Sequence, residues 1–174
     1  MNESFFCSDI HFSHKAIISF CNRGFIDTDE MNEKIIENWN NSVKPSDTVY
    51  FLGDFCFSNM PEIFFNRLNG CKYLIKGNHD RDKTQKLRWG WIKDTYMLKW
   101  NEELIWLSHY PHRSWPNSYH GSFHAFGHVH SKDGSKFFRS HDVGVDCWNF
   151  TPVNIKTFID KLKIEDKVDH HGRD

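Results

Sequence analysis

The chain has 174 residues, and its 22 Lys and Arg residues nearly balance 23 Asp and Glu residues, which leaves a formal net charge of −1. This length is typical of one domain and suffices to bury a hydrophobic core without disulfides. The balanced charge implies neither an acidic tail nor a generally basic surface that would coat nucleic acid, although specific contacts with nucleic acid stay open. We expect one domain over residues 1–165, followed by a polar C-terminal tail over residues 166–174.

The cysteines and the N-terminus indicate the compartment. The five cysteines are odd in number and show no Cys-x-x-Cys spacing, which is typical of free thiols in a reducing environment. The first residues carry no basic region, and no apolar stretch approaches the length of a membrane span. We therefore expect a cytoplasmic protein that does not cross a membrane; the sequence does not indicate an oligomeric state.

The first half of the chain alternates between strands and helices. Asp27 and Glu30 form the expected cap of one helix, whose apolar residues recur at helical spacing until Pro45. The expected order is strand 4–8, helix 15–22, a helix from 28 towards Pro45, strand 48–52, helix 61–68 and strand 73–75. This β-α-β-α-β order predicts three parallel strands joined by right-handed crossovers.

The second half predicts a different sheet. Residues 81–88 favour a short helix, and four short strands separated by polar turns follow, over 95–98, 104–108, 122–126 and 136–139. We expect these strands to form a second, mostly antiparallel sheet. A closing helix that opens at Thr151 and Pro152 is expected to cover a sheet face, so that two sheets pack together with helices outside.

Side chains of metal-ligand type follow the predicted strands. They are Asp9, His11, Asp54, Asn78, His109, His128 and His130. In the Asp-x-His and His-x-His pairs, a spacing of two would place both members on one face of an extended chain. The mixture of oxygen and imidazole nitrogen suits Mn, Fe, Zn or Ni better than calcium, and Asp54 could bridge two ions. Each residue alone has an ordinary structural explanation, whereas the combination does not.

The ordered motifs Asp-x-His, Gly-Asp, Gly-Asn-His-Asp, His and Gly-His-x-His extend from Asp9 to His130, and this order resembles the calcineurin-like metallophosphoesterase superfamily. The resemblance implies a four-layered α/β/β/α sandwich of two mixed sheets flanked by helices, with a two-metal centre at its edge. It assigns one ion to Asp9, His11, Asp54 and His130 and the other to Asp54, Asn78, His109 and His128. It also implies that His79 is catalytic and that Asp80 orients it.

The cofactors implied are two divalent metal ions, with Mn expected and Fe, Zn, Ni or Co as alternatives. In the mechanism of this superfamily the two ions hold a bridging hydroxide that attacks the phosphoester. His79 would donate a proton to the leaving oxygen or stabilise the transition state.

One motif departs from the phosphoprotein phosphatases of this superfamily. Those enzymes carry Gly-Asp-x-Val-Asp-Arg-Gly, whereas here Gly53-Asp54 is followed by Phe-Cys-Phe-Ser-Asn, so the phosphate-binding arginine is missing. This favours the compact bacterial or phage-type members. Candidate substitutes for that arginine are His14, Arg81, His112 and Arg113. Trp115 fits base stacking and core packing equally well.

Three functions stay open. The first is a phosphodiesterase acting on a nucleotide, a cyclic nucleotide or a nucleic-acid phosphoester. The second is a phosphomonoesterase acting on small metabolites, because the same metal centre would serve both reactions. The third is a non-enzymatic, metal-bound interaction scaffold, similar to the retromer subunit that resembles this superfamily. The scaffold is disfavoured because that subunit lacks the catalytic histidine position, whereas this chain retains His79.

Overall fold

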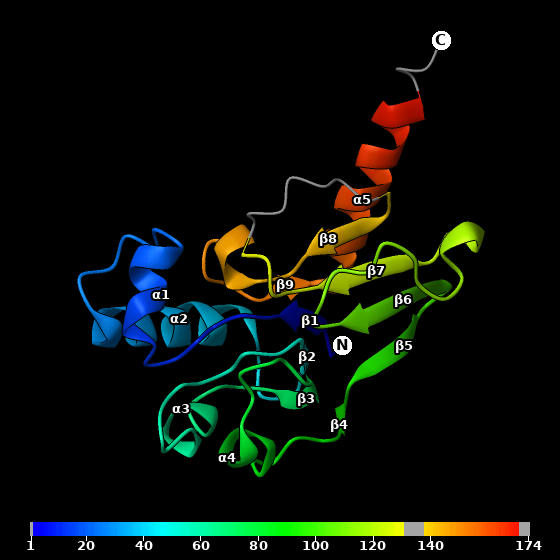
Figure 1. The fold of residues 1–174 in the computed structure, drawn as a ribbon. Helices are drawn as coiled ribbons and strands as arrows, with labels where there is room; N and C mark the ends of the chain where they lie inside the picture. Colours follow the sequence, from blue (N-terminus) through cyan, green and yellow to red (C-terminus); the bar gives the residue numbers. More distant parts are fainter. Residues whose placement is uncertain (1, 131–137, 171–174) are drawn as a thin grey trace.

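The structure is a computed structural model that describes residues 2–130 and 138–170. Its strands are β1 (Ser4–Cys7), β2 (Thr48–Phe51), β3 (Cys71–Ile75), β4 (Ile92–Lys93), β5 (Thr95–Trp100), β6 (Glu103–Ser108), β7 (Phe123–Phe126), β8 (Ser140–Asp142) and β9 (Val153–Asn154). Its helices are α1 (Lys15–Phe20), α2 (Thr28–Ser42), α3 (Glu62–Phe65), α4 (Asp82–Gln85) and α5 (Ile155–His170), with single turns of 3-10 helix at Ser118–His120 and Val145–Cys147. Two mixed sheets with flanking helices result, which confirms the predicted fold class (Figure 1).

The first sheet has the strand order β4-β3-β2-β1-β9. The pairs β1–β2 and β2–β3 are parallel, as predicted, and the unpredicted β4 continues this arrangement beside β3. The prediction that the closing helix starts at Thr151 was wrong, because Val153 and Asn154 form β9, antiparallel to β1. The helix begins at Ile155, where the Asn154 side chain accepts a hydrogen bond from the Lys156 amide.

The second sheet has the order β5-β6-β7-β8 and is mixed, so the prediction of mostly antiparallel pairing was wrong. Among the described strands of this sheet, only β5 and β6 form an antiparallel hairpin, which turns tightly at Asn101, where φ is 50°. The β6–β7 and β7–β8 pairs are parallel, and the chain returns between β6 and β7 through residues 109–122. The strand predicted over 136–139 lies partly outside the described residues, and β8 follows it.

The helices differ from the predictions mainly in length. Asp27 caps α2 as predicted, since its carboxylate accepts hydrogen bonds from the amides of Asp29 and Glu30. Both α3 and α4 are only four residues long, shorter than predicted. Helix α5 continues to His170, so residues 166–170 of the predicted tail are helical in backbone.

Two hydrophobic cores fill the two faces of the first sheet. The core beneath α1, α2 and α3 contains Ile35, Trp39 and Phe51, all fully buried. The core between the sheets contains Phe6 and Leu107 and also receives Phe158 from α5, whose ring meets Phe6 edge-on at 5.3 Å. Because apolar side chains occupy both faces, the polar residues gather at the ends of the strands.

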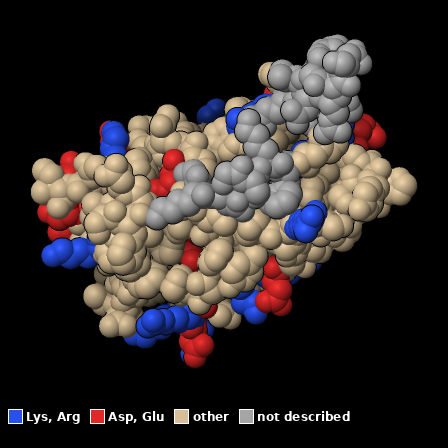
Figure 2. Space-filling model, turned by 45° about the horizontal axis from the view of Figure 1, so that its top comes forward, with Lys and Arg blue, Asp and Glu red and all other residues tan. Residues whose placement is uncertain are grey.

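The surface agrees with the balanced composition. On the face drawn in Figure 2, the Lys and Arg side chains of the described residues are scattered, most of them near the margins. Within residues 2–130 and 138–170, no helix combines the length and the apolar character needed to cross a membrane.

Candidate metal centre

The seven predicted ligands lie in loops that follow the carboxyl ends of β1, β2, β3, β6 and β7. Within the described residues they form two groups whose ligand atoms lie within 4.8 Å of one another. We call Asp9, His11 and His130 the first group, and Asp54, His109 and His128 the second group. Asn78 joins the second group, because its Oδ1 lies 2.9 Å from His109 Nε2.

Asp54 lies between the two groups. Its Oδ2 is 3.7 Å from His11 Nε2 in the first group and 3.6 Å from His109 Nε2 in the second. Its other oxygen, Oδ1, accepts a hydrogen bond from the His79 amide at 2.8 Å, which fixes the rotation of the carboxylate. One oxygen therefore faces nitrogen atoms from both groups.

Hydrogen bonds determine which ring nitrogen faces the centre. His109 Nδ1 lies 2.7 Å from the Leu52 carbonyl, which can only accept, so Nδ1 carries the proton and Nε2 of the neutral ring offers a lone pair. His130 Nδ1 lies 2.7 Å from an oxygen of Asp146 and is held in the same way. Lone pairs of His109, Asn78 and Asp54 therefore face one another, an arrangement that a cation stabilises.

The first group holds buried polar atoms without hydrogen-bond partners among the described residues. They are Asp9 Oδ1 and both ring nitrogens of His11. Burial raises the pKa of Asp9 well above its usual value, and the nearby carboxylate of Asp142 adds to this shift. Burial likewise lowers the pKa of His11 strongly. Unpartnered buried polar atoms are costly, so this donor set fits a divalent cation that would satisfy them.

The backbone explains how these loops place their side chains. Asp9, His11, Asp54, His128 and His130 all have positive φ, between 49° and 74°. The prediction that each x-spaced pair shares one face of an extended chain was therefore wrong. Both pairs lie beyond the ends of their strands in left-handed backbone, which brings the side chains together by loop curvature.

Two glycines allow the loops to approach closely. A Cβ at Gly53, where φ is +96°, would lie 2.6 Å from the backbone of Gly77. A Cβ at Gly127 would lie 2.3 Å from Asp9 Oδ2, the oxygen that accepts the amide hydrogen bond of His128. These positions therefore require glycine for contact between loops.

The sequence analysis missed a buried ion pair behind the first group. The Arg23 guanidinium donates to both oxygens of Asp146 at 2.8 Å, and its side chain is fully buried. It also donates to the backbone carbonyls of Asp9 and Ile10, at 2.7 and 2.8 Å. Burial alone would raise the pKa of Asp146, but hydrogen bonds from His130 and Arg23 hold that pKa below its usual value. The two residues are 123 positions apart, and no spacing in the sequence connects them.

Asp80 requires a correction. It was predicted to orient His79, but its carboxylate accepts hydrogen bonds from the backbone amides of Asp54, Phe55 and Gly77, at 2.8 to 3.0 Å. Asp80 is buried, and it ties the loop after β2 to the loop after β3. Its carboxylate therefore fixes the backbone of the site.

His79 is exposed and lies beside the centre. Its ring is 5.8 Å from His11 and 5.0 Å from Phe57, measured between centroids. His14 stacks on Phe57 at 3.9 Å, with an interplanar angle of 5°, and lies 5.6 Å from His11. Of the four predicted phosphate contacts, His14 thus adjoins the centre, and Arg81 lines a cavity together with His79.

The other predicted contacts are placed elsewhere. His112 Nδ1 accepts a hydrogen bond from the Trp106 indole, and Arg113 lines a separate cavity with Trp115. Trp115 is only 9% exposed, and its indole donates to the carbonyl and hydroxyl oxygens of Ser122. For Trp115 the structure favours packing over base stacking.

Comparisons with known proteins show the family to which the chain belongs. The family model described as calcineurin-like phosphoesterase matches residues 5–171. An uncharacterized protein of Methanocaldococcus jannaschii is 33% identical, over 97% of this chain and 95% of that protein.

Among solved structures, a protein of unknown function from Aquifex aeolicus has a TM-score of 0.76 and 26% identity, covering 93% of this chain and 100% of that chain. An archaeal phosphodiesterase has a TM-score of 0.50 and 19% identity, covering 82% of both chains. The second likeness is one of fold alone.

Proposed function

The chain belongs to the calcineurin-like phosphoesterase family, and from this premise we propose that it is a metal-dependent phosphodiesterase acting on a nucleotide, a cyclic nucleotide or a nucleic-acid phosphoester. Membership of the family implies a phosphoester substrate and divalent metal cofactors. The observation that carries the proposal is the position of Asp54 Oδ2 between nitrogen atoms of the two ligand groups.

We assign one ion to each group. The first ion would take the first group with Asp54, and the second ion would take the second group with Asn78. Manganese is the proposed metal, with Fe, Zn, Ni or Co as alternatives, because imidazole and carboxylate together suit this series. Such ions supply Lewis acidity and lower the pKa of the water that they bind.

His79 is the proposed general acid. It is exposed, its amide is fixed by Asp54, and its side chain lines the cavity next to the centre. A protonated imidazole there would donate to the leaving oxygen, which typically contributes ~10²–10⁴-fold to the rate. Asp80 supports this role indirectly, because its hydrogen bonds hold the loop on which His79 lies.

The surroundings favour a diester over a monoester. A phosphodiester carries one negative charge, whereas a monoester carries up to two near neutral pH and needs more cationic support. The rings of His14, Phe57 and His79 lie 5.4 to 5.8 Å from the His11 ring of the first group, measured between centroids. The nearest buried guanidinium, that of Arg23, is already paired with Asp146.

We also propose a cytoplasmic location, because none of the five cysteines, all of which lie in the described residues, forms a disulfide.

A hydrolysis assay tests the proposed function. Purified protein loaded with Mn²⁺ is expected to cleave bis-p-nitrophenyl phosphate faster than p-nitrophenyl phosphate. Cleavage of the monoester alone would favour the phosphomonoesterase. No hydrolysis of either compound with Mn, Ni, Co or Fe would contradict the enzyme and favour the scaffold.

A further inference from the structure

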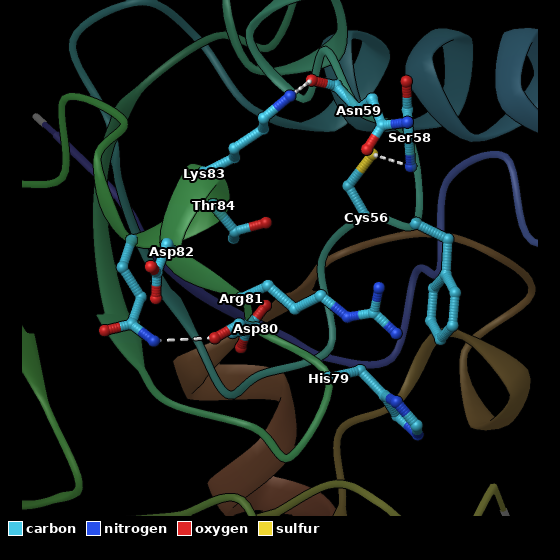
Figure 3. A pocket seen from close by; sticks show the side chains of 11 residues that line it. Cys56, Ser58, Asn59, His79, Asp80, Arg81, Asp82, Lys83 and Thr84 are labelled. Atoms are coloured by element: carbon cyan, nitrogen blue, oxygen red, sulfur yellow. Dashed lines mark hydrogen bonds between the residues drawn. The ribbon is translucent and has the colours of Figure 1, made fainter.

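A cavity of about 500 Å³ opens beside His79 (Figure 3). One wall is the loop after β2, with Phe57 and Asn59, and the other is the segment after β3 that includes α4. Lys83 bridges the two walls, since its Nζ donates to the Asn59 carbonyl at 2.9 Å. This volume lies within the range of sites that bind nucleotide-sized ligands.

Arg81 is the distinctive residue of this cavity. Its side chain and that of His79 extend to the same side in Figure 3. Among the residues that the structure describes, its guanidinium has no hydrogen bond and no ion pair, in contrast to Arg23, which has both. Asp80 lines the same cavity, but backbone amides occupy both of its oxygens, which leaves Asp82 as the other carboxylate there.

We propose that this cavity binds the leaving group of the substrate, and that this leaving group carries a second phosphate bound by Arg81. The inference rests on the proposed function, because it uses His79 as the acid that faces the leaving oxygen. A planar guanidinium binds a phosphate through two parallel hydrogen bonds, and Lys83 adds positive charge at the outer wall. The substrate class is therefore a phosphodiester with an additional phosphate, such as a short phosphorylated oligonucleotide.

The distribution of positive charge favours a short substrate over a long duplex. Duplex binding usually requires many cations along a continuous surface. On the face drawn in Figure 2, Lys and Arg side chains are instead scattered around the margins. The Arg81 guanidinium, which has no hydrogen bond or ion pair among the described residues, lies in a cavity that adjoins the metal centre at His79.

Matched dinucleotides test this inference. The Mn²⁺-loaded protein is assayed with ApA, with pApA and with ApAp, which differ only in the added phosphate and its end. One of the two phosphorylated substrates is expected to have a kcat/KM about tenfold above that of ApA, the size expected of a hydrogen bond to a charged group. The Arg81→Gln variant should reduce this ratio towards one. Arg88→Gln, which removes an exposed cation outside the cavity, should keep the ratio.

Three results would overturn the inference: an added phosphate that raises kcat/KM at neither end, a ratio that survives Arg81→Gln, or an equal loss of the ratio in Arg88→Gln. Circular dichroism melting of both variants checks that they fold. Failure of the proposed function would look different, because bis-p-nitrophenyl phosphate would then stay intact with every metal. If bis-p-nitrophenyl phosphate is hydrolysed but the kcat/KM ratio between phosphorylated and unphosphorylated dinucleotides does not depend on Arg81, the proposed phosphate site is wrong and the proposed function still holds.

Discussion

The two ligand groups are supported differently. In the first group, the proton of His130 is held by Asp146, a carboxylate that is itself paired with the buried Arg23. In the second group, the proton of His109 is held by the neutral carbonyl of Leu52, and Asn78 is exposed. A carboxylate behind a histidine raises its basicity more than a carbonyl does. We therefore expect the first group to bind its ion more tightly and the second to exchange its ion more readily.

The largest expected effect is the removal of the residue that both groups share. Asp54→Ala should abolish tight binding of both ions, because Asp54 Oδ2 faces both groups. The loss should exceed the ~10–100-fold that removal of an outer hydrogen-bond partner costs. Elemental analysis after gel filtration measures the metal content, with the exposed Asp160→Ala as the control. An unchanged metal content in Asp54→Ala would contradict the proposal that Asp54 binds the ions of both groups.

The second largest effect separates chemistry from metal binding. His79→Ala should keep both ions, because the ring of His79 belongs to neither group, and should lower kcat by ~10²–10⁴-fold. Steady-state kinetics at saturating substrate, together with metal analysis, measure both quantities on one sample. An unchanged kcat at full metal occupancy would exclude His79 from proton transfer.

A third variant divides the two groups. Asp146→Asn removes the carboxylate behind His130 and should weaken the first ion by ~10–100-fold, while the second ion stays bound. Stepwise metal titration by calorimetry should then show that the tighter step has weakened. The thermal stability of this variant is measured as well, because Arg23 loses its buried partner and the fold is expected to be less stable. Equal weakening of both steps would mean that the supports do not distinguish the groups.

The smallest expected effect is a change in stability with pH caused by His124, which is buried next to the segment that carries His109 of the second group. His124 is buried between the hydroxyls of Ser108 and Ser140, at 2.8 and 3.0 Å, and Ser108 precedes His109. Burial lowers the pKa of His124 to about 3. The unfolded chain, with a histidine pKa of about 6.5, binds the proton more readily. The contribution of neutral His124 to the free energy of unfolding is therefore complete above about pH 6.5 and is lost as the pH falls towards 3.

From pH 7.5 to pH 5.5, the His124 contribution predicts a loss of about 1 kcal/mol in the free energy of unfolding. Urea denaturation at both pH values measures it in the wild type and in His124→Gln, whose decline should be shallower. The exposed His120→Gln is the matched control. An identical pH dependence in all three proteins would contradict a buried neutral His124.

The sequence predicted the parts of this site that depend on order along the chain. Apolar runs followed by Asp54 and Asn78 indicated strands that end at one edge, since parallel strands deliver their carboxyl ends together. The left-handed backbone at His11 and His128 was not predictable, because residues other than glycine adopt it only where tertiary contacts impose it. The Arg23–Asp146 pair was missed for the same reason, as it depends on how remote segments meet.

The left-handed backbone at five candidate ligands is expected to lower the thermal stability of the fold at the positions that metal binding requires. A residue other than glycine pays roughly 1–2 kcal/mol to adopt this conformation, whereas Gly and Asn adopt it more easily. Replacing the three histidines among them, His11, His128 and His130, by glycine should therefore relieve local strain and at the same time remove metal ligands. In this chain, the left-handed backbone therefore lowers the free energy of unfolding at the positions that the metal centre needs.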